Sequence, residues 1–298
     1  MKIVSLVMPV YNGEEFLQNA IESVLKQNYH NYELIIVDDG STDSTNKIVQ
    51  RFSDKRIKYF FQNNTGVSGA RNLGIIKSIG DYICFIDSDD LLEPNYLDTL
   101  VELISDSDLG ICNFSIDGKK QVTEIEGKKT KRDTFLGLFS VNSFRGFLFN
   151  KIFKKSIIQT HNISFDTDDY MCEDSHFCAK YCQFIHTSIY RDICLYKYMV
   201  RTNSASHSFN KKRVSVIYTY KKIINLCTSL EDATLTSIQM SNYYVHLIRL
   251  YKLSLKYKEE YKDLIAMLNK ELRFNKKDAL KNKYLKGKYK LYYLLMFR

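Results

Sequence analysis

The chain has 298 residues, 45% of them hydrophobic, and carries 43 Lys and Arg against 34 Asp and Glu for a net charge of +9. This composition predicts a globular protein of one large or two modest domains. No run approaches the roughly 18 apolar residues of a membrane-spanning helix, and residues 1–15 predict a strand and a turn rather than a signal peptide. We therefore expect a cytoplasmic protein, whose seven scattered cysteines form no disulfides.

The charge is distributed unevenly along the chain. Residues 1–110 carry 9 Lys and Arg against 17 Asp and Glu, a net charge of −8, whereas residues 111–298 carry 34 against 17, a net charge of +17. A basic half can bind nucleic acid, anionic lipid or a phosphorylated substrate, and charge alone leaves all three open.

Strand and helix patterns alternate through the first 116 residues. Apolar runs predict strands at 2–10, 32–40, 56–62, 81–87 and 109–116, and helical spacing or capping residues predict helices at 14–27, 41–52, 68–79 and 93–104. Strands that are buried on both faces and joined by helices favour a mostly parallel sheet covered on both sides. The fold class is therefore α/β and Rossmann-like.

The rest of the chain is less regular. Residues 117–132 predict a polar hairpin or loop, residues 172–185 predict a helix, and almost everything after residue 210 is typical of helix. We expect three parts, at 1–110, 111–210 and 211–298, of which the last is helical and basic.

Three carboxylates crowd the end of a predicted buried strand, in the stretch "YICFIDSDD". Asp87, Asp89 and Asp90 would repel one another at this spacing, and each would raise its neighbour's pKa. A divalent cation removes the repulsion, and Mg²⁺ sites commonly combine one or two carboxylates with substrate phosphates. Ligands of such sheets bind at the carboxyl ends of the strands. The cluster therefore predicts a metal that holds a phosphate.

Several ordered motifs resemble one known family. They are "VMPVYNGEEFLQNAIESVLKQ", "YELIIVDDGSTDST", "NTGVSGARNLGI", "GDYICFIDSDD" and the "ED" of "CEDSHF". Together they resemble the inverting, nucleotide-sugar-dependent glycosyltransferases of family 2, which have the GT-A fold. The resemblance is nearly continuous over residues 1–115, and nothing after residue 210 contributes to it.

The resemblance implies a donor site built from the first half of the chain. Pro9, Tyr11 and Asp39 would contact the nucleotide base, with Asp39 accepting from a uracil N–H, and Arg71 would approach the donor. Asp87 would bind the ribose or assist the metal, beside Ser88.

The metal and the catalytic base are also assigned by resemblance. Asp89 would coordinate Mg²⁺ or Mn²⁺ on the diphosphate of a UDP-sugar, and Asp174 would be the general base of an inverting transfer. Arg201 and His207 would close over the diphosphate, with His207 near the metal. Residues 150–156, "NKIFKKS", would lie on the acceptor side.

Simpler interpretations exist for each of these motifs. The "DSDD" stretch can be a solvated turn, the "ED" pair a helix cap with Glu173 as the next candidate base, and residues 201–207 a basic surface loop. The cysteines and histidines at 172–186 fit no usual zinc spacing and favour a core helix face, so we expect no structural zinc.

Other functions remain to be weighed. "FIDSDD" superficially resembles the DxD motif of haloacid-dehalogenase-like phosphatases, although those place it on the first strand. A non-catalytic partner of another transferase is a second alternative. A nucleic-acid-binding role fits the basic half but has no recognisable motif.

The acceptor and cellular role follow only from the resemblance. Small bacterial members of the family imply transfer to a saccharide or lipid-linked saccharide in surface polysaccharide (capsule) synthesis, and an oligomer is compatible with this. Residues 281–298 combine basic residues with Leu285, Tyr289, Tyr292 and Met296 on one predicted helix face. That pattern predicts a peripheral contact with an anionic membrane, or else a core-packed helix.

Overall fold

The computed structural model describes residues 2–200 and 211–296, and the chain divides into two compact units. The first unit consists of Met1–Thr167 and Glu173–Thr202, and the second of Asp168–Cys172 and Asn203–Arg298. Among the described residues, no helix combines the length and apolar character needed to cross a bilayer.

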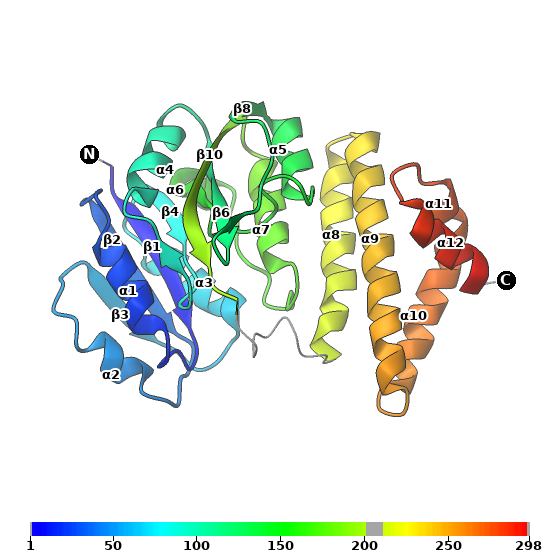
Figure 1. Ribbon diagram of the computed structural model, residues 1–298, viewed down its shortest axis with the longest axis horizontal. Coiled ribbons are helices and arrows are strands. Elements are labelled where there is room, and N and C mark those ends of the chain that lie inside the picture. The colour runs from blue at the N-terminus through cyan, green and yellow to red at the C-terminus, as the bar shows by residue number, and fades with distance from the viewer. Residues whose placement is uncertain (1, 201–210, 297–298) are drawn as a thin grey trace. The chain divides into compact units, whose positions relative to one another are not determined.

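One mixed sheet of ten strands organises the first unit (Figure 1). Its main path runs β3-β2-β1-β4-β9-β6-β10-β5, with β7 paired to β6 and β8 to β10. The strands have the bounds β1 Val4–Val10, β2 Tyr32–Asp38, β3 Ile57–Phe61, β4 Tyr82–Phe85, β5 Leu91–Leu92, β6 Leu109–Ile116, β7 Lys119–Lys120, β8 Gly127–Thr130, β9 Lys151–Lys154 and β10 Thr187–Tyr198.

Parallel pairing joins the strands predicted from the first half. β1 pairs with β2 and β4, and β2 with β3, all in parallel, and β6 pairs in parallel with β10. Between these sets lies β9, which is antiparallel to both β4 and β6. Every residue of β1 and β2 is buried, as expected for strands covered on both faces. The predicted α/β class is confirmed.

Helices cover both faces of the sheet (Figure 1). Their bounds are α1 Leu17–Leu25, α2 Thr45–Val49, α3 Val67–Lys77, α4 Tyr96–Ser105, α5 Lys131–Leu138, α6 Lys155–Thr160 and α7 Glu173–Cys182. Helix α3 approaches the sheet closely at Gly74, where an added Cβ would lie 2.2 Å from Cγ1 of Val7. Only glycine fits there, and this close approach fixes the depth of the helix that carries Arg71.

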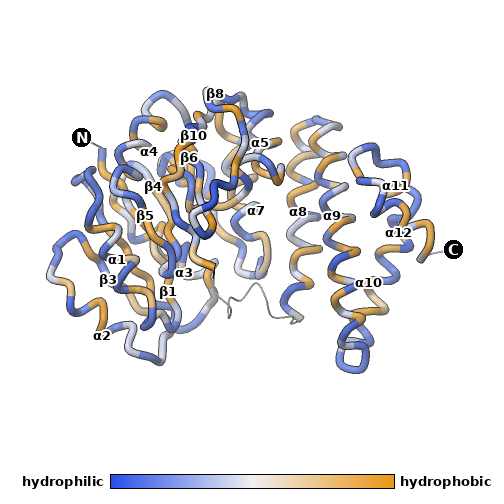
Figure 2. The backbone as a smooth tube through the Cα atoms, in the orientation of Figure 1, coloured by the Kyte–Doolittle hydropathy of each residue, from blue (hydrophilic) through white to orange (hydrophobic). Residues whose placement is uncertain are grey.

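The second unit is helical in the part that the structure describes. It contains a 3₁₀ turn at Lys211–Val214, α8 Ser215–Ser229, α9 Ala233–Ser254, a second turn at Leu255–Tyr257, α10 Lys262–Phe274, α11 Lys276–Lys281 and α12 Gly287–Met296. Bands of polar and apolar residues alternate along α8 and α9 (Figure 2), as in helices that bury one face. Tyr243, Tyr244 and Leu247 of α9 lie in the core of this unit.

The prediction that Leu285, Tyr289 and Tyr292 form a membrane-binding face of the last helix is wrong. Leu285 is only 3% exposed and belongs to the core, and Tyr289 and Tyr292 pack against that core. Tyr289 and Tyr292 contact Arg249 and Lys252 of α9, and side chains of this size bury more apolar surface in such a position than facing solvent. For Met296 the side chain lies outside the described set.

Candidate active site

The loops after β1, β2 and β4 meet at one edge of the sheet. The N–H of Asp39 donates to the carbonyl of Val10 at 2.8 Å, and the N–H of Ile86 donates to the carbonyl of Val7 at 3.1 Å. The carboxyl ends of three parallel strands therefore bring the "VYNG", "DDGS" and "DSDD" segments together, which is where sheets of this kind bind ligands.

Asp39 holds the start of helix α3. Its carboxylate accepts the backbone N–H groups of Thr65 at 2.9 Å and Gly66 at 2.8 Å, and the side-chain amide of Gln62 at 2.6 Å. Gly66 is the N-cap residue of α3 and has a positive φ of 84°, which favours glycine. Asp39 thus fixes the loop at 62–66 and the beginning of the helix that carries Arg71.

The acidic turn after β4 is fastened from strand β10. Asp90 is buried and accepts the hydroxyl of Tyr196 at 2.7 Å and the N–H of Met199 at 2.8 Å. The same tyrosine oxygen accepts the N–H of Asp87 at 3.2 Å. Burial, aided by the charge of Asp87, raises the pKa of Asp90 to about 8. Asp90 therefore anchors the turn and does not face the site.

Sequence reasoning missed this anchor. Asp90 is part of "DSDD", but nothing in the motif separates it from Asp87 and Asp89. Tyr196 carries no local signal at all, since it lies 106 residues away from Asp90. Its ring is stacked on Phe149 at 4.2 Å between centroids, so the hydroxyl is held rigidly.

Asp87 and Asp89 are only partly buried. Their carboxylates are hard oxygen donors at the carboxyl end of β4, and such donors suit Mg²⁺ or Mn²⁺. Asp90 is already hydrogen-bonded to Tyr196 and Met199, which leaves Asp87 and Asp89 as the two carboxylates of the turn that could hold the predicted metal.

Arg71 joins this turn to the predicted base. The guanidinium is buried, and it bonds three carboxylates: Asp174 at 2.6 Å, Glu173 at 3.1 Å and Asp87 at 3.3 Å. Phe165 packs against it, with the guanidinium carbon 5.5 Å from the ring centroid. The structure thus brings Arg71, Asp87 and Asp174 together as one charged cluster, to which it adds Glu173.

The electrostatics of the cluster favour a base that takes up a proton. Burial raises the pKa of Asp174 well above its usual value, Arg71 opposes that rise, and the nearby Glu173 and Asp87 add to it. A carboxylate whose pKa is raised accepts a proton more readily, as a general base must. Asp174 also lies in the first turn of helix α7, whose N-terminus favours the charged carboxylate and so, like Arg71, opposes the rise.

Pro9, Tyr11 and Ser88, also predicted for the donor site, lie outside the Arg71 cluster and differ in exposure. Pro9 is buried within β1, paired with Val37, whereas Tyr11 is 54% exposed beyond the strand end. Ser88 faces the first loop, because a Cβ added to Gly13 would lie 3.9 Å from its Oγ.

The predictions for Arg201 and His207 concern residues 201–210, which lie outside the described part of the chain.

Lys151 is buried and stabilises the segment at 145–150, which lies beside helix α7. Its ammonium donates to the carbonyls of Arg145 at 2.7 Å and Phe147 at 2.6 Å and to the side chain of Asn150 at 2.8 Å. Burial lowers the pKa of this lysine. The supported segment packs tightly on α7, since a Cβ on Gly146 would lie 2.4 Å from Oγ of Ser175, the residue after Asp174.

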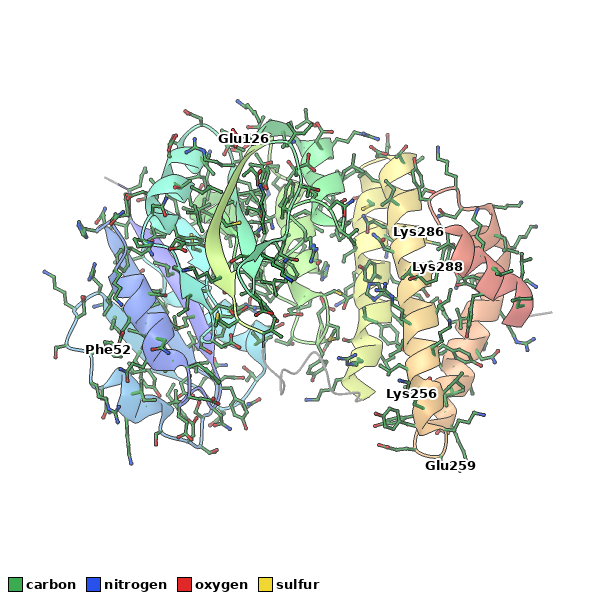
Figure 3. All side chains as sticks on the ribbon, in the orientation of Figure 1. Phe52, Glu126, Lys256, Glu259, Lys286 and Lys288 are labelled. Carbon is green, nitrogen blue, oxygen red and sulfur yellow. The ribbon has the colours of Figure 1, made fainter. Side chains whose placement is uncertain are left out.

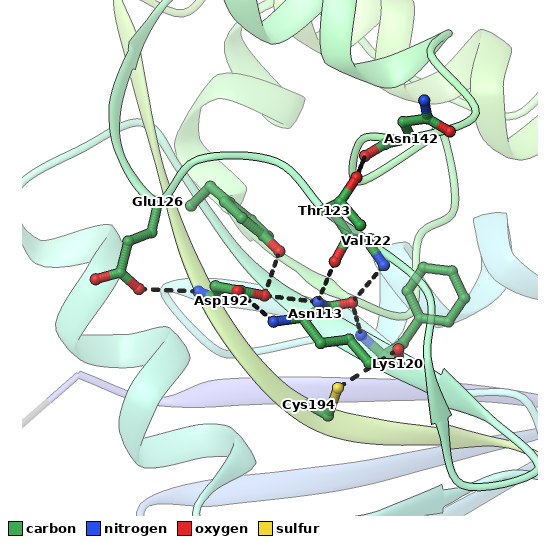
Figure 4. Close-up of polar contacts among 10 residues, drawn as sticks. Asn113, Lys120, Val122, Thr123, Glu126, Asn142, Asp192 and Cys194 are labelled. Carbon is green, nitrogen blue, oxygen red and sulfur yellow. Dashed lines mark hydrogen bonds and ion pairs between the residues drawn. The ribbon is translucent and has the colours of Figure 1, made fainter.

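A polar network fastens the predicted hairpin at 117–132 to β10 (Figure 4). The amide of Asn113 donates to Asp192 at 2.7 Å and to the carbonyl of Val122 at 3.1 Å, and Lys120 forms an ion pair with Asp192. The N–H of Asp192 donates to Glu126 at 3.2 Å. Two short strands, β7 and β8, form within this segment, which therefore belongs to the sheet of the first unit.

Comparison with known proteins agrees with this architecture. TarS of S. aureus (residues 1–349, in complex with UDP-GlcNAc) superposes with a TM-score of 0.70 at 21% identity, covering 90% of this chain and 79% of that one. The mannosyltransferase PcManGT of Pyrobaculum calidifontis, in complex with GDP-Man and Mn2+, has a TM-score of 0.57 at 16% identity, covering 99% and 83%. At these identities the likeness shows the fold alone, and it confirms the expected GT-A architecture.

Sequence comparison defines the family. The EpsH protein of Bacillus subtilis (strain 168) is 31% identical over an alignment of 226 residues that covers 70% of this chain and 64% of that protein. Glycosyltransferase GlyA of Streptococcus pneumoniae serotype 4 is 30% identical over an alignment of 229 residues that covers 70% of this chain and 32% of that protein. The chain thus spans 64% and 32% of the length of these two relatives. Residues 5–194 match the sequence model of "Glycosyl transferase family 2", so the chain belongs to that family.

Proposed function

We propose that the protein transfers a sugar from a nucleotide-sugar, a UDP-sugar by preference, to a hydroxyl of a saccharide or lipid-linked saccharide, with inversion at the anomeric carbon. The observation that carries the proposal is the Arg71 cluster. One guanidinium contacts Asp87 of the acidic turn and Asp174 at the start of α7. The two carboxylate functions of such a transferase, donor binding and proton removal, are thereby held at a fixed separation.

In this reaction Asp174 removes the proton from the acceptor hydroxyl. The oxygen then attacks the anomeric carbon from the face opposite the nucleotide diphosphate, so the bond to the diphosphate breaks as the new glycosidic bond forms. An α-linked donor gives a β-linked product. The raised pKa of Asp174 suits it to hold this proton, and Arg71 keeps its carboxylate directed.

Donor binding falls to the strand ends. We propose that Asp39, Pro9 and Tyr11 line the nucleobase side and that Asp87 and Ser88 lie at the ribose and diphosphate. Asp89, with Asp87, would hold Mg²⁺ or Mn²⁺, which as a Lewis acid stabilises the departing diphosphate. The ligands bound to TarS and to PcManGT, UDP-GlcNAc and GDP-Man with Mn2+, support a nucleotide-sugar donor.

The chain offers two alternatives that an assay separates. A non-catalytic partner would bind a nucleotide-sugar without turning it over, and a DxD phosphatase would release phosphate from simple phosphomonoesters. A role in capsule or other surface-polysaccharide synthesis, with the donor and acceptor parts at 1–110 and 111–210 and the helical part at 211–298, belongs to the same proposal.

The test begins with a screen of nucleotide-sugars by thermal shift in the presence of Mn²⁺, because a ligand that binds only the folded state raises the melting temperature. With the donor identified, Asp89→Asn and Asp174→Asn are compared by calorimetric titration and by initial rates. We expect Asp89→Asn to lose metal-dependent donor binding. Asp174→Asn should keep donor affinity while turnover falls by roughly 10²- to 10⁴-fold.

Asp106→Asn is the matched control, since Asp106 is an exposed aspartate of the same unit. It should leave both binding and rate unchanged, and circular dichroism checks that each variant is folded. Near-normal turnover of Asp174→Asn would show that the base lies elsewhere, with Glu173 as the next candidate. Donor binding without turnover by the unmodified protein, over a range of acceptors, would favour the non-catalytic alternative.

A further inference from the structure

The outward face of helix α12 carries a short stripe of leucines. Leu291, Leu294 and Leu295 are 54%, 49% and 57% exposed, although leucine side chains are usually buried. Their spacing of i, i+3 and i+4 places them on one side of the helix. The hydrophobic run at the end of α12 is visible in Figure 2 beside the C label.

The opposite face of α12 is already occupied. Tyr293 is fully buried in the core of the second unit, and Tyr289 and Tyr292 pack against it. These tyrosines have the same i, i+3, i+4 spacing as the leucines and lie on the other side of the helix. The tyrosines fix the orientation of α12 against the core, so the leucine stripe faces outward.

Lysines flank the stripe. At about 100° per residue, Lys288 and Lys290 fall on either side of the leucines around the helix. Lys286 and Lys288 are exposed (labelled in Figure 3), and residues 279–296 contain five lysines and no Asp or Glu. An apolar stripe between lysines that can extend along it is the arrangement of a helix lying in a membrane interface.

The charge of the helical part of this unit, residues 211–298, points the same way. Residues 211–298 contain 20 Lys and Arg against 7 Asp and Glu, a net charge of +13. On α10, a groove of about 510 Å³ is lined by Lys262, Lys270 and Arg273 together with apolar Ile265 and Ala266, and no acidic side chain lines it. This charge favours an anionic partner for the unit.

We propose that the leucine stripe, Leu291, Leu294 and Leu295, inserts into the interface of an anionic lipid bilayer while the flanking lysines meet the lipid head groups. A second copy of the chain is a poorer occupant, because it would bring two lysine-rich helices together. Three half-exposed leucines also offer roughly 300 Å², well below the ~800 Å² per partner of a stable interface. The inference deepens the proposed function, since a lipid-linked acceptor would lie in such a surface.

The test is co-sedimentation of the full chain with vesicles, which needs no sugar donor, so its failure would leave the proposed transfer reaction intact. We expect binding to phosphatidylglycerol vesicles at low salt, weaker binding at high salt, and little binding to phosphatidylcholine vesicles. The variant Leu291→Ser/Leu294→Ser/Leu295→Ser should bind on the order of 100-fold more weakly, at about fivefold per leucine.

A matched control removes three exposed apolar side chains from the other unit, in the variant Ile76→Ser/Ile79→Ser/Ile125→Ser. It should bind vesicles like the unmodified chain. The proposal is overturned if the leucine variant binds as well as this control, or if the unmodified chain does not bind anionic vesicles. It is also overturned if analytical ultracentrifugation shows a dimer that the leucine substitutions dissociate, because the stripe would then be an interface between copies.

Discussion

Replacing Arg71 by methionine should destabilise the protein strongly even without any ligand. The side chain is 5% exposed, and its guanidinium is the cation that the structure places among the carboxylates of Asp87, Glu173 and Asp174. Removing one partner of a buried ion pair costs about 3–5 kcal/mol, because the remaining charge stays buried. The carboxylates are partly exposed, so water screens their charges, and we expect the lower end, about 3 kcal/mol. At about 2–4 °C per kcal/mol, the melting temperature should fall by roughly 6–12 °C.

The assay is thermal melting of Arg71→Met at pH 5 and pH 7.5, without metal or donor. Loss of the guanidinium removes the charge that lowers the pKa of Asp174, so the folded variant binds more protons, and its destabilisation should be smaller at pH 5. In the double variant Arg71→Met/Asp174→Asn one orphaned carboxylate is gone, so part of the stability should return.

Arg191→Met is the matched control. Arg191 makes two bonds of 2.8 Å to Glu102, but the side chains are 38% and 64% exposed, so this pair should contribute no more than about 1 kcal/mol. Equal melting of Arg71→Met and Arg191→Met at pH 7.5 would refute the buried cluster. So would a double variant that is no more stable than Arg71→Met alone.

Three further predictions concern the strand ends. Tyr196→Phe removes the hydroxyl that bonds Asp90 and Asp87 of the acidic turn, so the free energy of unfolding in urea should fall by about 1–2 kcal/mol. Metal-dependent donor binding, measured by calorimetry, should weaken as well. Unchanged donor binding would show that the hydroxyl does not position the turn. Asp39→Asn should lower the free energy of unfolding in urea by about 1.5–3 kcal/mol, because an amide has one acceptor oxygen and cannot accept both backbone N–H groups, at 65 and 66. A loss below about 0.5 kcal/mol would contradict this prediction. The pKa of Asp90 is raised from 3.8 to about 8, so between these pH values the folded state holds a proton that the unfolded chain releases. The free energy of unfolding, measured in EDTA to remove metal, should therefore fall as the pH rises from about 4 to about 8. Asp90→Asn, which cannot ionise, should flatten that fall, and an identical pH profile for the variant would argue against the burial of the carboxyl.

Much of the fold of residues 1–116 follows from the sequence. Apolar runs between helical repeats are local patterns, and hydrophobic burial leaves them few arrangements other than a covered parallel sheet. The parallel pairing of β1 with β2 and β4 then places the polar residues after Val10, Asp38 and Phe85 at one edge, because the carboxyl ends of parallel strands coincide. The predicted strands correspond to β1, β2, β3, β4 and β6.

Tertiary structure alone decided which residues of these motifs face the site. Arg71 and Asp174 are 103 residues apart, and Asp90 and Tyr196 are 106 apart, yet both pairs are in hydrogen-bond contact. No local pattern encodes such pairs, because each depends on how the whole fold brings the end of β10 to the turn after β4 and the start of α7 to Arg71 of helix α3. The "DSDD" motif therefore predicted an acidic site but could not show that its last aspartate is an anchor.

Helix α12 illustrates the same limit on a smaller scale. Its sequence offers two apolar stripes, one of tyrosines and one of leucines, and the periodicity of an isolated helix cannot rank them. Packing against the core of the second unit decides between them. Tyr293 is fully buried there, while Leu294 remains half exposed. The sequence by itself thus determined that the helix is amphipathic and basic, and only packing against the other helices determined which stripe is left outside.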